Sequence, residues 1–192
     1  MEERSEVMHQ YEKINGLYQL LSGNRKNSRM DIETYVQRHY LEQILEAANQ
    51  RFQDMSAGQF ELRMCDIDKA GTGKNRGLDL MVYSAVTGKV REVRTLSGGE
   101  SFMAALSLAL GMADQIQESS AAINLDMMFI DEGFGSLDEH SRDQAVKVLQ
   151  NMAEGEKLIG IISHVTELKQ EIEDQLIVSK DEKGSHVKWQ IS

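Results

Sequence analysis

The sequence predicts an α/β fold in which a mixed sheet is flanked by helices and preceded by a separate amino-terminal helix. Short apolar segments at residues 123–130 and 158–162 have the length and composition of strands. Longer apolar segments with helical periodicity lie before and between them, and the 192 residues contain no proline. Strands that alternate with helices in this way favour a sheet covered by helical layers.

The amino-terminal segment has heptad spacing. Val7, Tyr11, Ile14, Tyr18 and Leu21 recur at alternating intervals of four and three residues, and a Ser-Gly-Asn sequence follows them. Two heptads are compatible with a piece of a coiled coil or with an amphipathic helix packed on the rest of the chain. We interpret residues 1–22 as a coiled-coil stump and residues 23–192 as the globular part.

A long helix is expected over residues 29–53, where Ser28 and Asp31 have the spacing of a capping box. The apolar residues that would lie along one side of this helix are Ile32, Val36, Tyr40, Ile44, Ala48 and Phe52. Two strands are expected next, at residues 59–65 and 78–83, joined by a glycine-rich loop.

Ser97, Gly98 and Gly99 directly precede a largely apolar segment that begins with Glu100 and ends near residue 117, and we expect this segment to form a helix buried almost all round. The first turn of a helix has unpaired N–H groups and partial positive charge, so it can bind an anion. The glycines allow a phosphate to approach the backbone, and Ser97 can cap the helix or donate its hydroxyl to a phosphate oxygen. An ordinary capped helix after a glycine turn is the local alternative.

Asp131 and Glu132 follow directly on the apolar segment 123–130. Ligands collect outside the carboxyl ends of the strands in parallel α/β sheets. Asp131 is suited to hold Mg²⁺ there, because a hard cation prefers carboxylate oxygen. Glu132 is placed to orient or deprotonate the water that attacks a γ-phosphate. Taken in isolation, two adjacent carboxylates would more often be a solvated loop.

Ser136 and Asp138 belong to the loop that follows this strand. Asp138 is the expected N-cap of a helix that begins near Glu139 and stops at Gly155. The loop therefore connects the acidic pair to a helix with a defined start.

The segment 158–162 reads as a second buried strand, and His164 lies just beyond its carboxyl end. An imidazole there could reach a γ-phosphate, whereas a structural, hydrogen-bonded histidine is the alternative. Strands at 175–179 and 186–191 are expected to close the fold as a hairpin around residues 181–184.

In chain order, these motifs resemble those of ABC-type ATPases. Residues 96–100 are similar to the signature, residues 127–132 to the Walker B strand with its catalytic glutamate, and residues 136–138 to the D-loop. His164 is similar to the switch histidine. The resemblance implies that the fold is the carboxyl-terminal lobe of an ABC-type ATPase head.

The most specific resemblance is to the carboxyl-terminal ATPase head of the SbcC family, an SMC-like group of DNA double-strand-break-repair ATPases. It rests on residues 96–102 and 129–138, within a similar block over roughly residues 95–164. It implies catalytic roles for Glu132 and His164. The other implied sites are the ATP γ-phosphate contacts made in trans by Ser97, Gly98, Gly99 and Glu100, the D-loop residues Ser136 and Asp138, and the Mg²⁺ ligand Asp131.

The same resemblance implies ATP and Mg²⁺ as cofactors and a set of partners. The partners are the amino-terminal Walker A half of the same protein, a second head in a homodimer, an SbcD-type metallophosphoesterase nuclease, and DNA through the assembled complex. The implied function is an ATPase that dimerises around ATP and controls the exonuclease and endonuclease activity of its partner. A chromosome-organising SMC-type head that tethers DNA without a nuclease partner is the alternative.

A phosphate loop is missing from the chain. Such a loop needs a glycine, four residues, and then Gly-Lys followed by Ser or Thr. Residues 71–75 come nearest, but the position of the earlier glycine is Asp68 and the position of the final hydroxyl is Asn75. The fragment alone is therefore expected to be inactive. A transporter nucleotide-binding domain is disfavoured because it would carry this loop in the same chain.

The composition argues against the chain as the main DNA-binding surface. Its formal net charge is −10, whereas nucleic-acid binders are usually basic. Lys89, Arg91 and Arg94 form a local basic cluster that is either solvated surface or a phosphate contact. The single cysteine, Cys65, excludes an internal disulfide and suits the reducing bacterial cytoplasm, and no apolar run is long enough to predict a membrane span.

Overall fold

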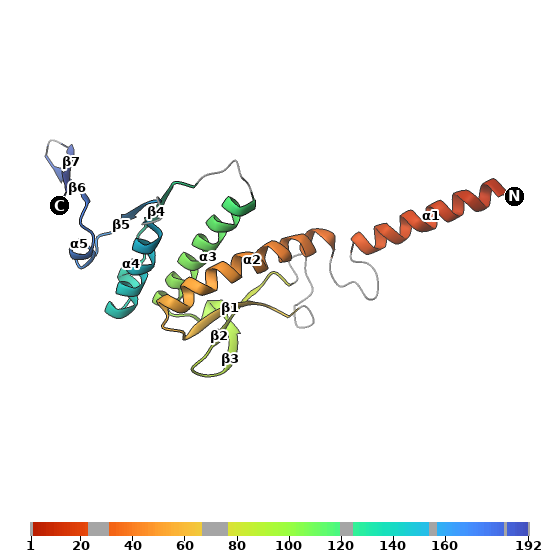
Figure 1. Cartoon of the computed structure of the whole chain (residues 1–192), viewed down its shortest axis with the longest axis horizontal. Coiled ribbons are helices and arrows are strands. Elements are labelled where there is room, and N and C mark those ends of the chain that lie inside the picture. Colours follow the sequence, from red (N-terminus) through yellow and green to blue (C-terminus); the bar gives the residue numbers. More distant parts are fainter. Residues whose placement is uncertain are drawn as a thin grey trace.

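The computed structural model describes residues 2–22, 31–66, 77–119, 125–153, 157–182 and 184–191. The helices are α1 (Glu2–Leu21), α2 (Ile32–Met55), α3 (Gly98–Ser119), α4 (Glu139–Ala153) and the short α5 (Leu168–Glu171), with 3₁₀ turns η1 (Val93–Thr95) and η2 (Phe134–Ser136). The strands are β1 (Phe60–Met64), β2 (Leu80–Ser84), β3 (Lys89–Glu92), β4 (Met127–Asp131), β5 (Leu158–Ile162), β6 (Gln175–Asp181) and β7 (Gly184–Gln190). Figure 1 shows their order along the molecule.

The α/β class is confirmed, but the described strands form three small sheets and not one mixed sheet. β1, β2 and β3 form an antiparallel sheet, β4 and β5 pair in parallel, and β6 and β7 form an antiparallel hairpin. Strand β3 was not expected from the sequence, where residues 89–92 are mostly charged. The strand expected to begin at residue 123 begins at Met127, and residues 123 and 124 lie outside the described residues. The loop with residues 71–75 also lies outside them.

Helix α2 begins later than expected because Asp31 is its N-cap. The Asp31 carboxylate accepts a hydrogen bond of 2.7 Å from the Thr34 backbone N–H. The expected partner of Asp31 in a capping box, Ser28, lies outside the described residues. The expected apolar side of α2 is also only half correct, because Ala48 and Phe52 are buried whereas Ile32, Val36 and Tyr40 are exposed.

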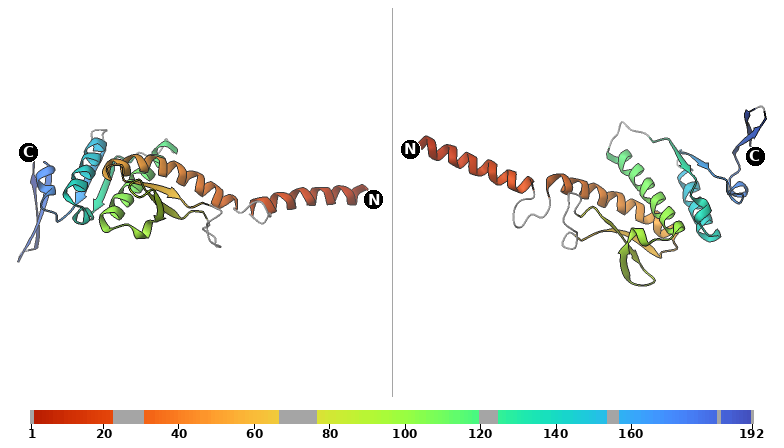
Figure 2. Two further views of the ribbon diagram at one scale, coloured as in Figure 1. Left: turned by 90° about the horizontal axis from the view of Figure 1, so that it is seen from below. Right: turned by 180° about the vertical axis from the view of Figure 1, so that it is seen from behind.

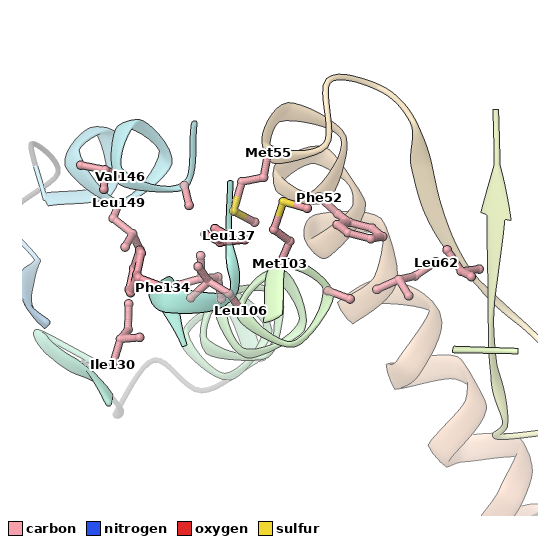
Figure 3. Packing of buried hydrophobic residues seen from close by; sticks show 14 of the residues in the cluster. Phe52, Met55, Leu62, Met103, Leu106, Ile130, Phe134, Leu137, Val146 and Leu149 are labelled. Atoms are coloured by element: carbon pink, nitrogen blue, oxygen red, sulfur yellow. The ribbon is translucent and has the colours of Figure 1, made fainter. Parts of the chain in front are cut away.

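The core lies between α2, α3, the β1–β2 strands and α4 (Figure 3). Phe52 and Phe134 are its largest fully buried side chains. Its other buried members in Figure 3 include Met55, Leu62, Met103, Leu106, Ile130, Leu137, Val146 and Leu149. This core fixes the start of α3 relative to the end of β4, so packing positions the two motifs that the sequence singles out.

Helix α3 is buried on one side and not all round. Met103, Leu106 and Leu110 face the core, whereas Met112 and Ile116 are exposed. The helix also begins at Gly98 and not at Glu100, so both glycines belong to its first turn. Its outer side stays uncovered by the described part of the chain.

The β4–β5 sheet, expected to be buried, has one covered face and one open face. Met128, Ile130, Ile159 and Ile161 alternate along the strands and pack against the core. The opposite face is exposed, and its large side chains are Met127, Phe129, Leu158 and Ile162. The expectation of buried strands was therefore wrong for half of each strand, because only one layer of helices covers this sheet within the described residues.

Helix α1 projects from one end of the molecule, and the β6–β7 hairpin lies at the other end (Figures 1 and 2). The heptad positions Tyr11, Ile14 and Tyr18 are 62%, 67% and 65% exposed. These side chains are not covered by the rest of the chain that the structure describes. Among the described residues, the helices lack the length and apolarity needed to cross a membrane.

Candidate nucleotide-binding site

The start of α3 is held by a reciprocal capping box between Ser97 and Glu100. The Ser97 backbone N–H donates to the Glu100 carboxylate at 2.7 Å, and the Glu100 N–H donates to the Ser97 hydroxyl at 3.3 Å. The hydroxyl accepts in this pair, so its own hydrogen is free to be donated. Ser97 and Gly98 are exposed, which leaves the helix start accessible to an anion.

The signature segment packs directly on the D-loop segment of the same chain. A Cβ atom added to Gly99 would come within 2.8 Å of the Ser136 carbonyl oxygen, so this approach requires a glycine. The Ser136 hydroxyl in turn donates to the Gly133 carbonyl at 2.7 Å. An open pocket of about 220 Å³ lies beside this contact, and its lining includes Ser97, Gly99, Glu100, Ser136 and Asp138.

Asp138 caps helix α4, as the sequence predicts. Its carboxylate accepts from the Ser141 backbone N–H and from the Ser141 hydroxyl, both at 2.9 Å. These hydrogen bonds, that of the Ser141 N–H first, lower the pKa of Asp138 because they stabilise the ionised carboxylate. The D-loop is thus tied at its end to the first turn of α4.

Glu132 and His164 meet at the carboxyl ends of the parallel strands β4 and β5. The His164 Nδ1 atom lies 3.0 Å from a carboxylate oxygen of Glu132. The Glu132 backbone N–H donates to the Ile162 carbonyl at 2.8 Å, which continues the strand pairing and fixes the distance between the two residues. Both side chains are largely exposed, His164 at 76% and Glu132 at 57%. This exposure leaves the imidazole accessible, and its hydrogen bond to Glu132 fits both a phosphate-reaching and a structural histidine.

Two consecutive residues with positive φ change the direction of the chain after β4. Glu132 has φ +62° and Gly133 has φ +98°. A Cβ atom on Gly133 would overlap the Phe102 ring, which packs edge-on against the buried Phe134 ring at 5.0 Å. Helix α3, through its residue Phe102, therefore packs against the turn that carries Glu132. Both aromatic residues belong to the segments that carry the family resemblance, but nothing in the sequence indicates their contact with each other.

The predicted site residues fall into two groups. Ser97, Gly98, Gly99, Glu100, Ser136 and Asp138 lie around the start of α3. Glu132 and His164 form a second group with Asp131, which is exposed at the end of β4. Among the described residues, no three histidine, cysteine, aspartate or glutamate side chains gather as a metal site. Asp131 alone would thus suit an ion whose other ligands are water or phosphate oxygens.

The fold is similar to solved heads of SMC ATPases. One is a chain from a study of ATP-driven dimerisation and DNA-stimulated activation of SMC ATPases, with a TM-score of 0.62 and 15% identity over 81% of this chain and 88% of that chain. Another is the Smc head domain with an extended coiled coil, bound to the carboxyl-terminal domain of ScpA, from Pyrococcus furiosus. It has a TM-score of 0.57 and 17% identity over 79% of this chain and 35% of that chain. The fold is that of an SMC-like ATPase head.

Sequence comparison narrows this class. Residues 78–151 match the family model described as SbcC/RAD50-like, Walker B motif. The SbcC subunit of the nuclease SbcCD from Treponema pallidum is 44% identical over 97% of this chain, and that from Vibrio cholerae is 44% identical over 92%. The resemblance predicted from the motifs is confirmed: the chain is related by sequence to the SbcC family. It spans 17% of the length of each of these two relatives.

Proposed function

We propose that the chain is the carboxyl-terminal half of an ATPase head that binds and hydrolyses ATP, pairs with a second head and controls an SbcD-type nuclease. The contact between Glu132 and His164 carries this proposal: it brings a carboxylate and an imidazole together at the carboxyl ends of adjacent parallel strands, where a general base and a phosphate contact would be needed. The names of the relatives, which are subunits of the SbcCD nuclease, support the link to a nuclease.

In this proposal Glu132 orients and deprotonates the attacking water, and His164 reaches the γ-phosphate. Their mutual hydrogen bond holds both side chains on one side of the β4–β5 edge. Mg²⁺ would be held by Asp131 together with phosphate and water oxygens, and it would neutralise charge on the phosphates. The exposure of all three side chains suits a site that closes only when a nucleotide and further protein cover it.

Ser97 to Glu100 would bind the γ-phosphate of the ATP that sits on the opposite head. The free Ser97 hydroxyl hydrogen and the N–H groups of the first turn of α3 supply donors for that phosphate. The Walker A loop that cradles the rest of the nucleotide would come from the amino-terminal half of the protein, because no complete phosphate loop exists in this sequence. The similarity in fold to a chain from a study of ATP-driven dimerisation of SMC ATPases supports pairing of this kind.

Residues 1–22 would be the last part of the returning strand of a coiled coil that joins the two halves, with residues 23–192 as the lobe. The exposed heptad positions of α1 support this division, since an apolar stripe on a projecting helix needs a partner helix. DNA would be contacted by the assembled complex, at the nucleoid in the bacterial cytoplasm. The isolated lobe would contribute little to that contact because its net charge is −10.

Ser97→Arg in the full-length protein tests the proposal. The substitution places a large side chain where the γ-phosphate of the opposite head would dock. ATP-dependent pairing of the heads, followed by light scattering with a slowly hydrolysed ATP analogue, should be lost. Binding of a fluorescent nucleotide at Walker A should survive, and the melting temperature should change little because Ser97 is exposed. A variant that pairs as the unmodified protein does would refute the assignment of the signature segment.

The alternative of a chromosome-organising head without a nuclease makes a different prediction about partners. Its fold would be the same, as the SMC structures illustrate, so the fold does not separate the two functions. The sequence relatives favour the nuclease-linked function. Co-purification of the full-length protein with a metallophosphoesterase encoded beside it would support that function. A full-length protein that pairs around ATP but does not bind this enzyme would favour the alternative.

A further inference from the structure

Arg91 contacts Thr95, which directly precedes the signature segment (residues 96–100), and Glu100, the last residue of that segment. Its Nη1 atom donates to the Thr95 carbonyl at 2.6 Å and lies 3.1 Å from the Thr95 hydroxyl. Its Nη2 atom lies 3.4 Å from the Glu100 carboxylate oxygen that accepts the Ser97 backbone N–H. The guanidinium therefore connects Thr95, two positions before Ser97, to Glu100, whose carboxylate completes the capping box with Ser97.

The Glu100 carboxylate creates an electrostatic problem that Arg91 can solve. A carboxylate in the first turn stabilises the helix, but it adds negative charge where a phosphate should dock. The Arg91 and Glu100 side chains are only 34% and 25% exposed, so water screens their charges less than it screens those of a fully exposed pair. A guanidinium held against this carboxylate reduces the repulsion that an incoming phosphate meets.

Arg91 also connects the signature segment to the antiparallel sheet. It lies in β3 and is paired in register with Val82, whose side chain is fully buried in β2. The guanidinium carbon lies 5.7 Å from the centre of the Phe60 ring of β1. The position of Arg91 is therefore set by the sheet and not by the signature segment itself, which allows it to act as a fixed anchor.

We propose that Arg91 is a positioning residue for the signature site: it anchors the Thr95 carbonyl to β3 and balances the charge of Glu100, so that an anion can dock at Ser97. This inference rests on the proposed function, since it concerns the same site. It also corrects one interpretation of the basic cluster of Lys89, Arg91 and Arg94. Arg91 is engaged inside the chain, whereas Arg94 pairs with the neighbouring Glu92 and its side chain is 80% exposed.

Arg91→Ala in the full-length protein should raise the concentration of a slowly hydrolysed ATP analogue needed for half-maximal head pairing by about tenfold. That factor is what the loss of one charge-assisted hydrogen bond predicts. Nucleotide affinity at Walker A should be unchanged. Adding Glu100→Gln to Arg91→Ala should recover part of the pairing, because it removes the uncompensated charge. A role confined to folding would not produce this recovery.

Arg94→Ala is the matched control, because it removes the same charge three residues away from Arg91. The heads of this variant should pair as those of the unmodified protein do. For Arg91→Lys, the concentration of ATP analogue needed for half-maximal pairing should lie between those of the two alanine variants, since lysine keeps the charge but cannot donate from two nitrogen atoms at once. Arg91→Lys also replaces Arg91→Ala as the test if a thermal melt shows that the alanine variant does not fold. The inference is overturned if the folded Arg91 variant pairs normally, if Arg94→Ala pairs equally poorly, or if Glu100→Gln brings no recovery.

Ser97→Arg, measured in the same assay, separates a failure of this inference from a failure of the proposed function. If Ser97→Arg abolishes pairing and the Arg91 variants do not weaken it, only the role of Arg91 is wrong. If Ser97→Arg also pairs normally, the signature segment does not dock a phosphate and both proposals fail.

Discussion

Replacing Gly133 by alanine should destabilise the fold more than the same replacement at a glycine that also has positive φ but has space for a Cβ atom. Gly133 has φ +98° and follows Glu132, which itself has φ +62°. An alanine Cβ would overlap the Phe102 ring, and that ring is held against the fully buried Phe134. The substitution therefore strains the backbone and displaces an aromatic side chain of the signature helix.

The size of the effect follows from these two contributions. Left-handed backbone costs an L-residue about 1–2 kcal/mol. Moving the Phe102 ring disturbs an edge-to-face aromatic pair, which contributes about 0.5–1.5 kcal/mol beyond its buried area. Overpacking of the surrounding core adds to this, so we expect a total loss of about 2–4 kcal/mol in the free energy of unfolding.

Urea unfolding of the isolated chain, followed by far-ultraviolet circular dichroism, measures this loss. Gly88→Ala is the matched control, because Gly88 has φ +66° and a Cβ there would meet nothing within 4 Å. It should lose only the backbone contribution of about 1–2 kcal/mol. If Gly133→Ala costs no more than Gly88→Ala, the Phe102 contact does not restrict the turn at Gly133, and the coupling of the signature helix to Glu132 is wrong.

Three further predictions concern nucleotide chemistry and capping. The isolated chain should show negligible ATP affinity by calorimetry, because no residue here can cradle the β-phosphate, and tight binding would contradict the half-site argument. Glu132→Gln in the full-length protein should keep nucleotide binding and head pairing but lower the single-turnover hydrolysis rate by roughly 10²–10⁴-fold, and an unchanged rate would remove Glu132 from its role. The lowered pKa of Asp138 means that its ionised form stabilises the fold above the ordinary aspartate pKa of about 3.9, and that this contribution is lost as the pH falls through the lowered value. Asparagine can still cap α4, so on acidification the melting temperature of Asp138→Asn should fall less than that of the unmodified chain. Identical decreases would contradict the stabilising role of the ionised Asp138 carboxylate.

Local signals in the sequence predicted the caps and strand ends well. Asp138 was expected to cap α4 and does so through Ser141, because a capping side chain needs only backbone N–H groups in the next turn. The segment 158–162 is a strand with those bounds. The expected hairpin also forms, but its strands reach two residues further into the turn on each side, because Asp181 still pairs with Gly184. The start of α2 was misplaced because Ser28 was taken as the cap of the helix, whereas Asp31 is the N-cap and accepts from the Thr34 backbone N–H.

Contacts between distant segments were less predictable. The spacing of Ser97 and Glu100 is that of a capping box and could have been recognised from the sequence. Arg91 looked like one member of a basic surface cluster, since nothing local indicates that β3 carries it to the Thr95 carbonyl. The support of the Glu132 turn by Phe102 was equally invisible, because it depends on how α3 crosses the end of β4.

The sequence by itself determined the order of the motifs, the residue types proposed for the site (Ser97, Asp131, Glu132 and His164) and the similarity to SbcC, because these depend on residue types at fixed spacing. Only the tertiary structure decided which apolar residues are covered. Phe129 and Ile130 are neighbours in one apolar strand, yet Phe129 is 64% exposed and Ile130 is 9% exposed. Successive side chains of a strand point to opposite faces, and burial depends on the layer that each face meets. For the same reason the pairing of Glu132 with His164 exists only once β4 and β5 lie side by side.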